Sequence, residues 1–190
     1  MKALVVYESM FGNTREVADR IADGLRPGLD VTVMPVGAAS ADVVAGADVL
    51  VVGGPTHVHG MPSDRTRKMA KTMADKEGSE LVLEPRALEP GLREWLRTLR
   101  VRPGVVAAAF DTRAHGPAVF TGRASRRIAR RLRRQGVQVR ETASFFVDKN
   151  GRLCGGEAER AQAWGAALLH ELRGETGAMT PVSPPSSQQG

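Results

Sequence analysis

The sequence has few cysteines and aromatic residues and no long apolar segment. Cys154 is the single cysteine among 190 residues, which excludes an internal disulfide framework and suits a reducing compartment. No uninterrupted apolar run is long enough to cross a membrane, and the first residues lack the basic-then-apolar pattern of a secretory signal. We therefore expect a cytoplasmic protein that makes no contact with a membrane.

Several signatures of phosphate chemistry are also missing. The chain has no Gly-Lys-Ser/Thr loop for ATP or GTP, and no Gly-x-Gly-x-x-Gly follows its first predicted strand. The third predicted strand ends in Gly53-Gly-Pro55, without the carboxylate that a phosphoryl-accepting signalling domain needs. Cys154 and Arg160 have the Cys-x5-Arg spacing of a tyrosine phosphatase, but they follow the last predicted strand, and two glutamates lie between them. We interpret that match as chance.

What the chain does contain is an alternation of short apolar segments with amphipathic ones. This pattern predicts an α/β fold: a doubly wound, five-stranded parallel sheet in the order 2-1-3-4-5 within a three-layer αβα arrangement. Proline in the second strand places that strand at an edge. The predicted strands span residues 3–7, 29–35, 47–53, 104–110 and 137–147, and the predicted helices span 15–25, 40–45, 63–73, 88–99, 123–134 and 157–172.

The chain divides into one domain and a tail. Residues 1–173 carry the alternating pattern and form the predicted domain. Residues 174–190 are rich in Pro, Ser, Gln and Gly and are expected to be disordered. Between two predicted helices lies a polar linker, residues 75–84, which is a candidate lid over a ligand.

A small polar turn joins the first strand to the first helix and is suited to binding a phosphate. It reads Glu8-Ser-Met-Phe-Gly-Asn-Thr14. The start of a helix leaves backbone N–H groups without partners and carries the positive end of the helix dipole. Ser9, Asn13 and Thr14 can add side-chain donors. The alternative is an ordinary turn in which Asn13 or Thr14 caps the helix.

Three turns that are far apart in the sequence should meet at one edge of this sheet. Residues 8–14 follow the first strand, 54–62 follow the third and 111–117 follow the fourth, and in such folds a ligand lies beyond the carboxyl ends of the strands. His57, His59 and His115, with Asp111, could form a metal site there. A His-x-His pair needs a further fixed ligand, so we favour histidines beside a cofactor and expect no metal.

The first of these turns, Ser9-Met-Phe-Gly-Asn-Thr14, resembles the FMN phosphate loop of the flavodoxin superfamily, Ser/Thr-x-x-Gly-Asn-Thr directly after the first strand. Residues 53–62 and 110–113 resemble that family's second and third flavin loops, and the resemblance spans roughly residues 1–173. It implies a flavodoxin-like fold and a non-covalently bound FMN. The residues that it implies as FMN contacts are Ser9, Met10, Phe11, Gly12, Asn13, Thr14, Pro55, Thr56, His57, Val58, His59, Gly60, Phe110, Asp111, Thr112 and Arg113.

The sequence departs from the family in its aromatic content. Electron-carrier flavodoxins usually stack the flavin between aromatic side chains, and neither residues 55–61 nor residues 111–117 contain Phe, Tyr or Trp. Each missing stack forfeits roughly 0.5–1.5 kcal/mol, which is up to about tenfold in affinity. The imidazoles of His57 and His59, with Met10 and Phe11, are candidates to replace the missing rings.

The charge also departs from that of acidic electron carriers. The formal net charge is +6, and residues 123–134 contain seven arginines around an apolar stripe. This pattern is typical of an amphipathic helix that packs on a sheet and has a solvated face. The same face could steer an acidic redox partner. Nucleic-acid binding is not expected, because no interleaved aromatic residues or recognition motif accompany the arginines.

Two functions stay open at the level of the sequence. The first is an FMN flavoprotein that transfers electrons, either as a carrier for a redox partner protein or as a small oxidoreductase of quinone-like acceptors. No residue is expected to be catalytic in its own right, because the flavin supplies the redox chemistry. The second is a flavodoxin-like binding module whose flavin is weak or lost, and which engages an acidic partner through residues 123–134.

Overall fold

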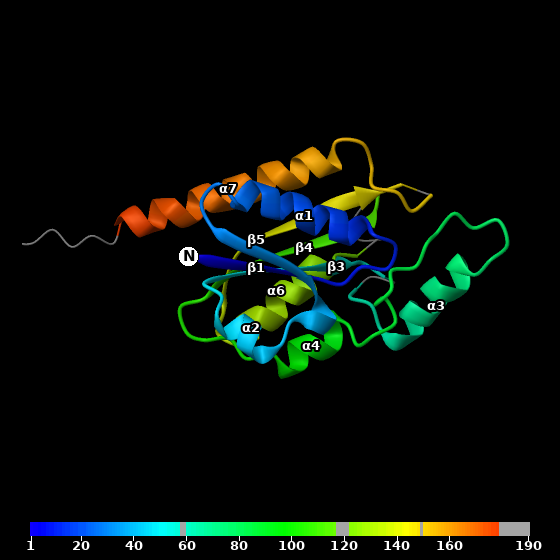
Figure 1. The fold of residues 1–190 in the computed structure, drawn as a ribbon, viewed down its shortest axis with the longest axis horizontal. Helices are drawn as coiled ribbons and strands as arrows, with labels where there is room; N and C mark the ends of the chain where they lie inside the picture. The colour runs from blue at the N-terminus through cyan, green and yellow to red at the C-terminus, as the bar shows by residue number, and fades with distance from the viewer. Residues whose placement is uncertain (58–59, 117–121, 149, 179–190) are drawn as a thin grey trace, which may run out of the picture.

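A five-stranded parallel sheet forms the centre of the computed structural model, which describes all residues except 58–59, 117–121, 149 and 179–190 (Figure 1). The spatial order β2-β1-β3-β4-β5 confirms the predicted topology, and the proline-containing strand lies at an edge as predicted. The strands are β1 (Lys2–Tyr7), β2 (Asp30–Pro35), β3 (Val49–Pro55), β4 (Val106–Ala114) and β5 (Gln138–Val147).

Helices cover both faces of the sheet and give the predicted three layers. In Figure 1, α1 and α7 lie on one face, α2, α4 and α6 lie on the other, and α3 lies beyond the carboxyl ends of the strands. No helix in the described part of the chain is both long and apolar enough to cross a membrane. The helices are α1 (Asn13–Leu25), α2 (Ala41–Ala45), α3 (Asp64–Ala74), α4 (Leu92–Thr98), α6 (Ala124–Arg134) and α7 (Glu157–Ala178), with a short 3₁₀ turn, η1, at Val36–Ala38.

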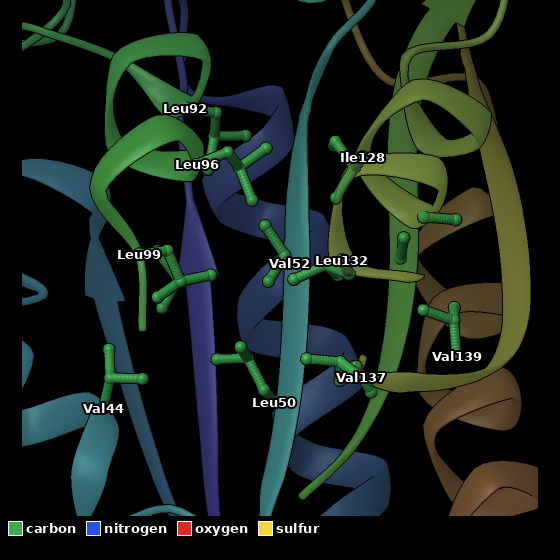
Figure 2. Packing of buried hydrophobic residues seen from close by; sticks show 14 of the residues in the cluster. Val44, Leu50, Val52, Leu92, Leu96, Leu99, Ile128, Leu132, Val137 and Val139 are labelled. Carbon is green, nitrogen blue, oxygen red and sulfur yellow. The ribbon is translucent and has the colours of Figure 1, made fainter. Parts of the chain in front are cut away.

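The central strand β3 is buried along its whole length because both of its faces are covered. Val49 and Val51 point into the layer beneath α1 and α7, whereas Leu50 and Val52 point into the opposite layer. Figure 2 shows that second layer, where apolar side chains of α4 and α6 meet those of β3. The residues of the two helices labelled there are Leu92, Leu96, Ile128 and Leu132.

Two boundaries differ from the predicted ones in ways that affect the site. Strand β4 continues to Ala114, because β3 on one side and β5 on the other supply backbone partners past residue 110. The predicted turn at 111–113 is therefore the end of a strand. Helix α4 begins at Leu92 rather than at 88, since Pro90 and Gly91 precede it and proline is not compatible with a helix interior.

The last helix is longer than predicted. Helix α7 ends at Ala178, so the predicted boundary between domain and tail, after residue 173, falls inside a helix. Residues 179–190 of the predicted tail lie outside the described residues. The structure places residues 174–178 in α7, and the disordered tail stays a prediction.

Helices α1 and α7 approach each other closely because glycines lie where they cross. A Cβ atom on Gly24 would lie 2.2 Å from the carbonyl oxygen of Gln162, and one on Gly165 would lie 2.3 Å from the carbonyl oxygen of Ile21. These distances are far below van der Waals contact, so any larger residue would push the two backbones apart. The close approach of α1 and α7 therefore depends on glycine at positions 24 and 165.

We expect the Gly24→Ala variant to be less stable than the wild type, although alanine is the better helix former. Overpacking of a close contact typically costs about 1–3 kcal/mol, which exceeds the roughly 1 kcal/mol of helix propensity gained. Chemical denaturation of both proteins measures this difference. The control is Gly174→Ala in α7, where an added Cβ would meet nothing within 4 Å. Equal stability of Gly24→Ala and the control would contradict the packing argument.

Candidate functional site

The first turn, residues 8–14, is built around Gly12, whose φ of 90° is a conformation that favours glycine. The N–H of Gly12 donates to Ser9 Oγ over 3.1 Å, and α1 begins at the next residue without a side-chain cap. In the described part of the chain, no acceptor receives the backbone N–H groups of Asn13, Thr14 and Arg15. The capping alternative is therefore wrong, and the helix presents open donors.

The polar side chains of the first turn join it to other segments of the same edge. Thr14 is 2% exposed, and its Oγ1 lies 2.7 Å from Oγ1 of Thr112 in β4. The Asn13 amide donates to the carbonyl oxygen of Gly151 over 2.7 Å. Gly151 belongs to a segment after β5 that folds back along that strand through backbone pairing of Val147 with Leu153.

The second turn, residues 54–62, lies beside the end of β4. The N–H of Thr56 donates to the carbonyl oxygen of Thr112 over 2.8 Å, and His57 and Gly60 exchange two backbone hydrogen bonds of 2.7 and 3.0 Å. Two predicted contacts, Val58 and His59, lie outside the described residues. Burial lowers the pKa of His57, and the positive charge of Arg67 lowers it further. The imidazole is therefore held in its neutral form.

The third segment, residues 110–113, alternates between the two packing layers because it is a strand. Phe110 is fully buried against Phe145, edge to face with ring centroids 6.4 Å apart. Asp111 is also fully buried, and its Oδ2 accepts from the Ser125 N–H at the start of α6 over 2.7 Å. Burial raises the pKa of Asp111. Both side chains serve the core and a helix terminus rather than the cavity beyond the strand.

The three segments enclose a cavity of about 220 Å³ at the carboxyl edge of the sheet. The structure thus brings most of the predicted residues together, while Phe110, Asp111, Gly12 and Gly60 do not line this cavity. Three lining residues were missed by the sequence analysis: Ala114, Val147 and Gly151. Topology alone could have indicated the last two, since β5 ends at the same edge. The lining residues are Ser9, Met10, Phe11, Asn13, Thr14, Pro55, Thr56, His57, Thr112, Arg113, Ala114, Val147 and Gly151.

A buried ion pair supports the first turn from beneath. Glu8 is 4% exposed and Arg67 is 2% exposed; Arg67 Nη1 donates to Glu8 Oε1 over 3.2 Å. The other oxygen of Glu8 accepts from the Leu92 N–H over 2.9 Å, and Arg67 also binds Asp64 and Glu94. Burial raises the pKa of Glu8 against the opposing effects of these donors. One carboxylate therefore ties α3 and α4 to the end of β1.

The linker at residues 75–84 packs on the outer side of the first turn. The Glu84 N–H donates to the carbonyl oxygen of Met10 over 2.8 Å, and Glu84 Oε1 lies 3.3 Å from Arg15 Nε. Met10 is buried in a small cluster with Ala70 and Ala87. No linker residue lines the cavity. The arrangement gives the linker a supporting position rather than that of a lid.

Neither a metal site nor a tyrosine-phosphatase site finds support among the described residues. Among the described residues, no group of three or more His, Cys, Asp or Glu side chains is placed to hold a metal ion. The arginine of the Cys-x5-Arg match, Arg160, binds the carboxylate of Glu157 and stacks over the ring of Phe145. Its guanidinium is therefore committed elsewhere than beside Cys154.

The fold and the cavity together define a doubly wound α/β protein with a ligand site at the switch point of its sheet. The family model described as "Flavodoxin" matches residues 5–94. A curated flavodoxin of Aquifex aeolicus (strain VF5) is 39% identical over 59 residues, which is 30% of this chain and 32% of that protein. The aligned stretch thus spans about a third of the curated relative.

Solved flavodoxins share the fold over nearly their whole length. Oxidised flavodoxin 1 from Bacillus cereus superimposes with a TM-score of 0.61 at 20% identity, covering 90% of this chain and 98% of that one. A flavodoxin from the domain Archaea gives 0.59 at 21% identity, covering 91% and 99%. The fold is flavodoxin-like, and the comparisons together support a flavodoxin-like family for this chain.

We expect removal of Arg67 to be strongly destabilising, because it leaves the carboxylate of Glu8 buried without its charge partner. Breaking a buried pair in this way typically costs about 3–5 kcal/mol. Urea denaturation of Arg67→Ala measures the loss. The matched control is Arg65→Ala on the same helix, an exposed arginine whose removal should change stability by less than about 0.5 kcal/mol. A loss in Arg67→Ala as small as that of the control would disprove a structural role for the pair.

His57 predicts a dependence of stability on pH. Its folded-state pKa lies below the unfolded value of about 6.5, so the neutral form favours the folded state. This contribution is complete above the unfolded pKa and is lost as the pH falls through it toward the folded pKa. Thermal melts between about pH 8 and pH 5 should therefore lose less stability in His57→Gln than in the wild type.

The control for this measurement is His170→Gln, which removes an exposed histidine on α7. It should keep the acid-side loss of stability seen in the wild type. If His57→Gln showed the same loss as well, the imidazole would not be the group responsible.

Proposed function

We propose that the chain binds FMN non-covalently and transfers electrons. The observation that carries this proposal is the position of the cavity, which lies at the open amino terminus of α1 and is lined by residues from all three predicted flavin segments. The family model and the flavodoxin-like fold support the same cofactor.

The first turn fits the phosphate of FMN. The unpartnered N–H groups of Asn13, Thr14 and Arg15 and the positive end of the α1 dipole attract an anion there. The hydroxyls of Ser9 and Thr14 line the same cavity and can donate to phosphate oxygens. The carboxylate of Glu84, which would lie 3.4 Å from a Cβ on Gly12, is paired with Arg15, and this pairing reduces its repulsion of a phosphate.

The remaining lining suits a flat, partly apolar group. Pro55, His57, Ala114 and Phe11 all line the cavity, whose volume of about 220 Å³ is smaller than the ~300–1,000 Å³ of typical cofactor pockets. Part of the cofactor would therefore extend over the rim toward solvent. Arg113 brings positive charge to this wall; its Nη1 donates to the carbonyl oxygen of Gly116 over 2.8 Å, and its guanidinium lies 4.7 Å from the Phe146 ring centre.

When bound, FMN would supply the electron or hydride transfer, and the protein would supply orientation and electrostatics. The positive Arg113 side chain favours negative charge on the cofactor. The neutral His57 can accept or donate one hydrogen bond without changing the net charge of the site. We extend the proposal to a cytoplasmic protein that passes electrons to a redox partner protein or to a small quinone-like acceptor. A flavin-free binding module is the outcome to be distinguished from it.

Titration of FMN with the full-length protein tests this proposal. We expect saturable quenching of flavin fluorescence by the wild type. Thr14→Ala should bind FMN about 10- to 100-fold more weakly, since a hydrogen bond to a charged group contributes about 1.5–3 kcal/mol. Thermal melts establish that the variant is folded. The control, Thr72→Ala, removes an exposed hydroxyl of α3 and should bind as the wild type does.

Two results would count against the assignment. Flavin fluorescence that stays unquenched at high wild-type concentration would remove FMN from the proposal and leave the binding module. Tight FMN binding that is unchanged in Thr14→Ala would place the phosphate somewhere other than the first turn.

A further inference from the structure

Helices α4 and α6 form a continuous surface on the face of the sheet opposite α1 and α7. The two helices lie side by side in Figure 1, and both pack into the same apolar layer. The Gln135 side chain, at the end of α6, donates to the carbonyl oxygen of Leu96 in α4 over 2.8 Å. Side chains that project outward from both helices therefore belong to one surface.

That surface is made basic by six arginines, and we refer to it as the α4/α6 basic face. Each helix keeps its apolar residues inward, so its arginines are left on the outer side. Four of the six are exposed, and two, Arg93 and Arg131, are half-buried. The members are Arg93 and Arg97 of α4 and Arg127, Arg130, Arg131 and Arg134 of α6.

Little negative charge balances this face. Helix α6 contains no acidic residue, and the carboxylate of Glu94 on α4 binds Arg67 and the Gly91 N–H instead. Among the described residues, no carboxylate pairs with any of the six arginines. Burial lowers the pKa of Arg131, and four neighbouring arginines lower it further. The free protein thus keeps like charges close together, a repulsion that carboxylates of a partner would relieve.

The α4/α6 basic face reaches the second turn of the candidate site. Arg93 donates to the carbonyl oxygens of Met61 and Pro62 over 2.7 and 3.1 Å. In the same turn, a Cβ on Gly60 would lie 3.0 Å from Arg127 Nη1. Gly60 is bonded through its backbone to His57, which lines the cavity. A partner seated on these arginines would lie next to the edge of the proposed flavin site.

We propose that the α4/α6 basic face docks a small acidic redox protein, so that its carboxylates meet the arginines beside the second turn. This rests on the proposed electron-transfer function, which gives such a partner a reason to bind there. A single-stranded nucleic acid is disfavoured because α4 and α6, as described, present no exposed aromatic ring for base stacking. The one aromatic residue of α4, Trp95, donates its indole N–H to the carbonyl oxygen of Ala39.

The probe for this proposal is a plant-type [2Fe–2S] ferredoxin of net negative charge, titrated against the full-length protein by calorimetry. We expect binding that weakens by tenfold or more between about 20 and 200 mM salt, as charge-steered association does. The triple variant Arg127→Gln, Arg130→Gln and Arg134→Gln should bind at least tenfold more weakly. The matched control neutralises Arg20, Arg26 and Arg173 on the opposite side, which changes the net charge equally and should leave the affinity within about twofold.

Each outcome decides the proposal. Absent or salt-independent ferredoxin binding would overturn it, and so would equal weakening in the two triple variants, which would show an effect of net charge alone. Tighter binding of a duplex DNA of similar charge, weakened by the same triple variant, would assign the face to nucleic acid instead. Flavin fluorescence measured on the same samples separates the two proposals: FMN binding without ferredoxin binding refutes docking alone, and ferredoxin binding without FMN binding refutes the flavin site alone.

Discussion

The parallel order of the sheet is the constraint on which the rest of the structure depends. Because β1, β3 and β4 run in the same direction and lie side by side, the segments that follow them must meet at one edge. The 2.7 Å contact between the hydroxyls of Thr14 and Thr112 joins residues 98 positions apart and brings the start of α1 against the end of β4. These elements converge around the cavity, and the first backbone N–H groups of α1 have no acceptor there among the described residues.

Sequence patterns were sufficient for the fold because the signals there are strong. Continuous apolar segments such as β3 occur where both faces of a sheet are covered, and the apolar stripe of α6 matches its buried residues Ile128 and Leu132. The first turn was predictable as well, since its glycine takes the backbone conformation that glycine favours. The length of β4 was not predictable from local sequence, because the partners that extend it come from β3 and β5.

The residues that the sequence could not place are those whose role is set by long-range contacts. Asp111 looked like part of a turn, yet its carboxylate accepts the Ser125 N–H at the start of α6 inside the core. Glu8 stood beside the phosphate-type turn without a visible role, and its partner Arg67 is distant in sequence. No periodicity or motif in the sequence indicates contacts such as Asp111–Ser125 and Glu8–Arg67. In the structure, these contacts hold the edge of the sheet around a cavity whose lining has few aromatic side chains.

Charge sets this chain apart from acidic electron carriers and links the site to its surroundings. The cavity wall carries Arg113, and helices α4 and α6 carry the α4/α6 basic face. The first favours an anionic cofactor, and the second favours an anionic partner. The same electrostatic sign suits both proposals, a phosphate at the first turn and an acidic partner beside the second.

Amide chemical shifts of the ¹⁵N-labelled protein, recorded with and without FMN, test the central claim most directly. The account predicts that the largest shifts fall on Asn13, Thr14 and Arg15, whose N–H groups have no acceptor among the described residues. Smaller shifts are expected on Thr56, Thr112 and Ala114, which line the same cavity. Shifts that leave the start of α1 unchanged and gather elsewhere on the protein would contradict the account.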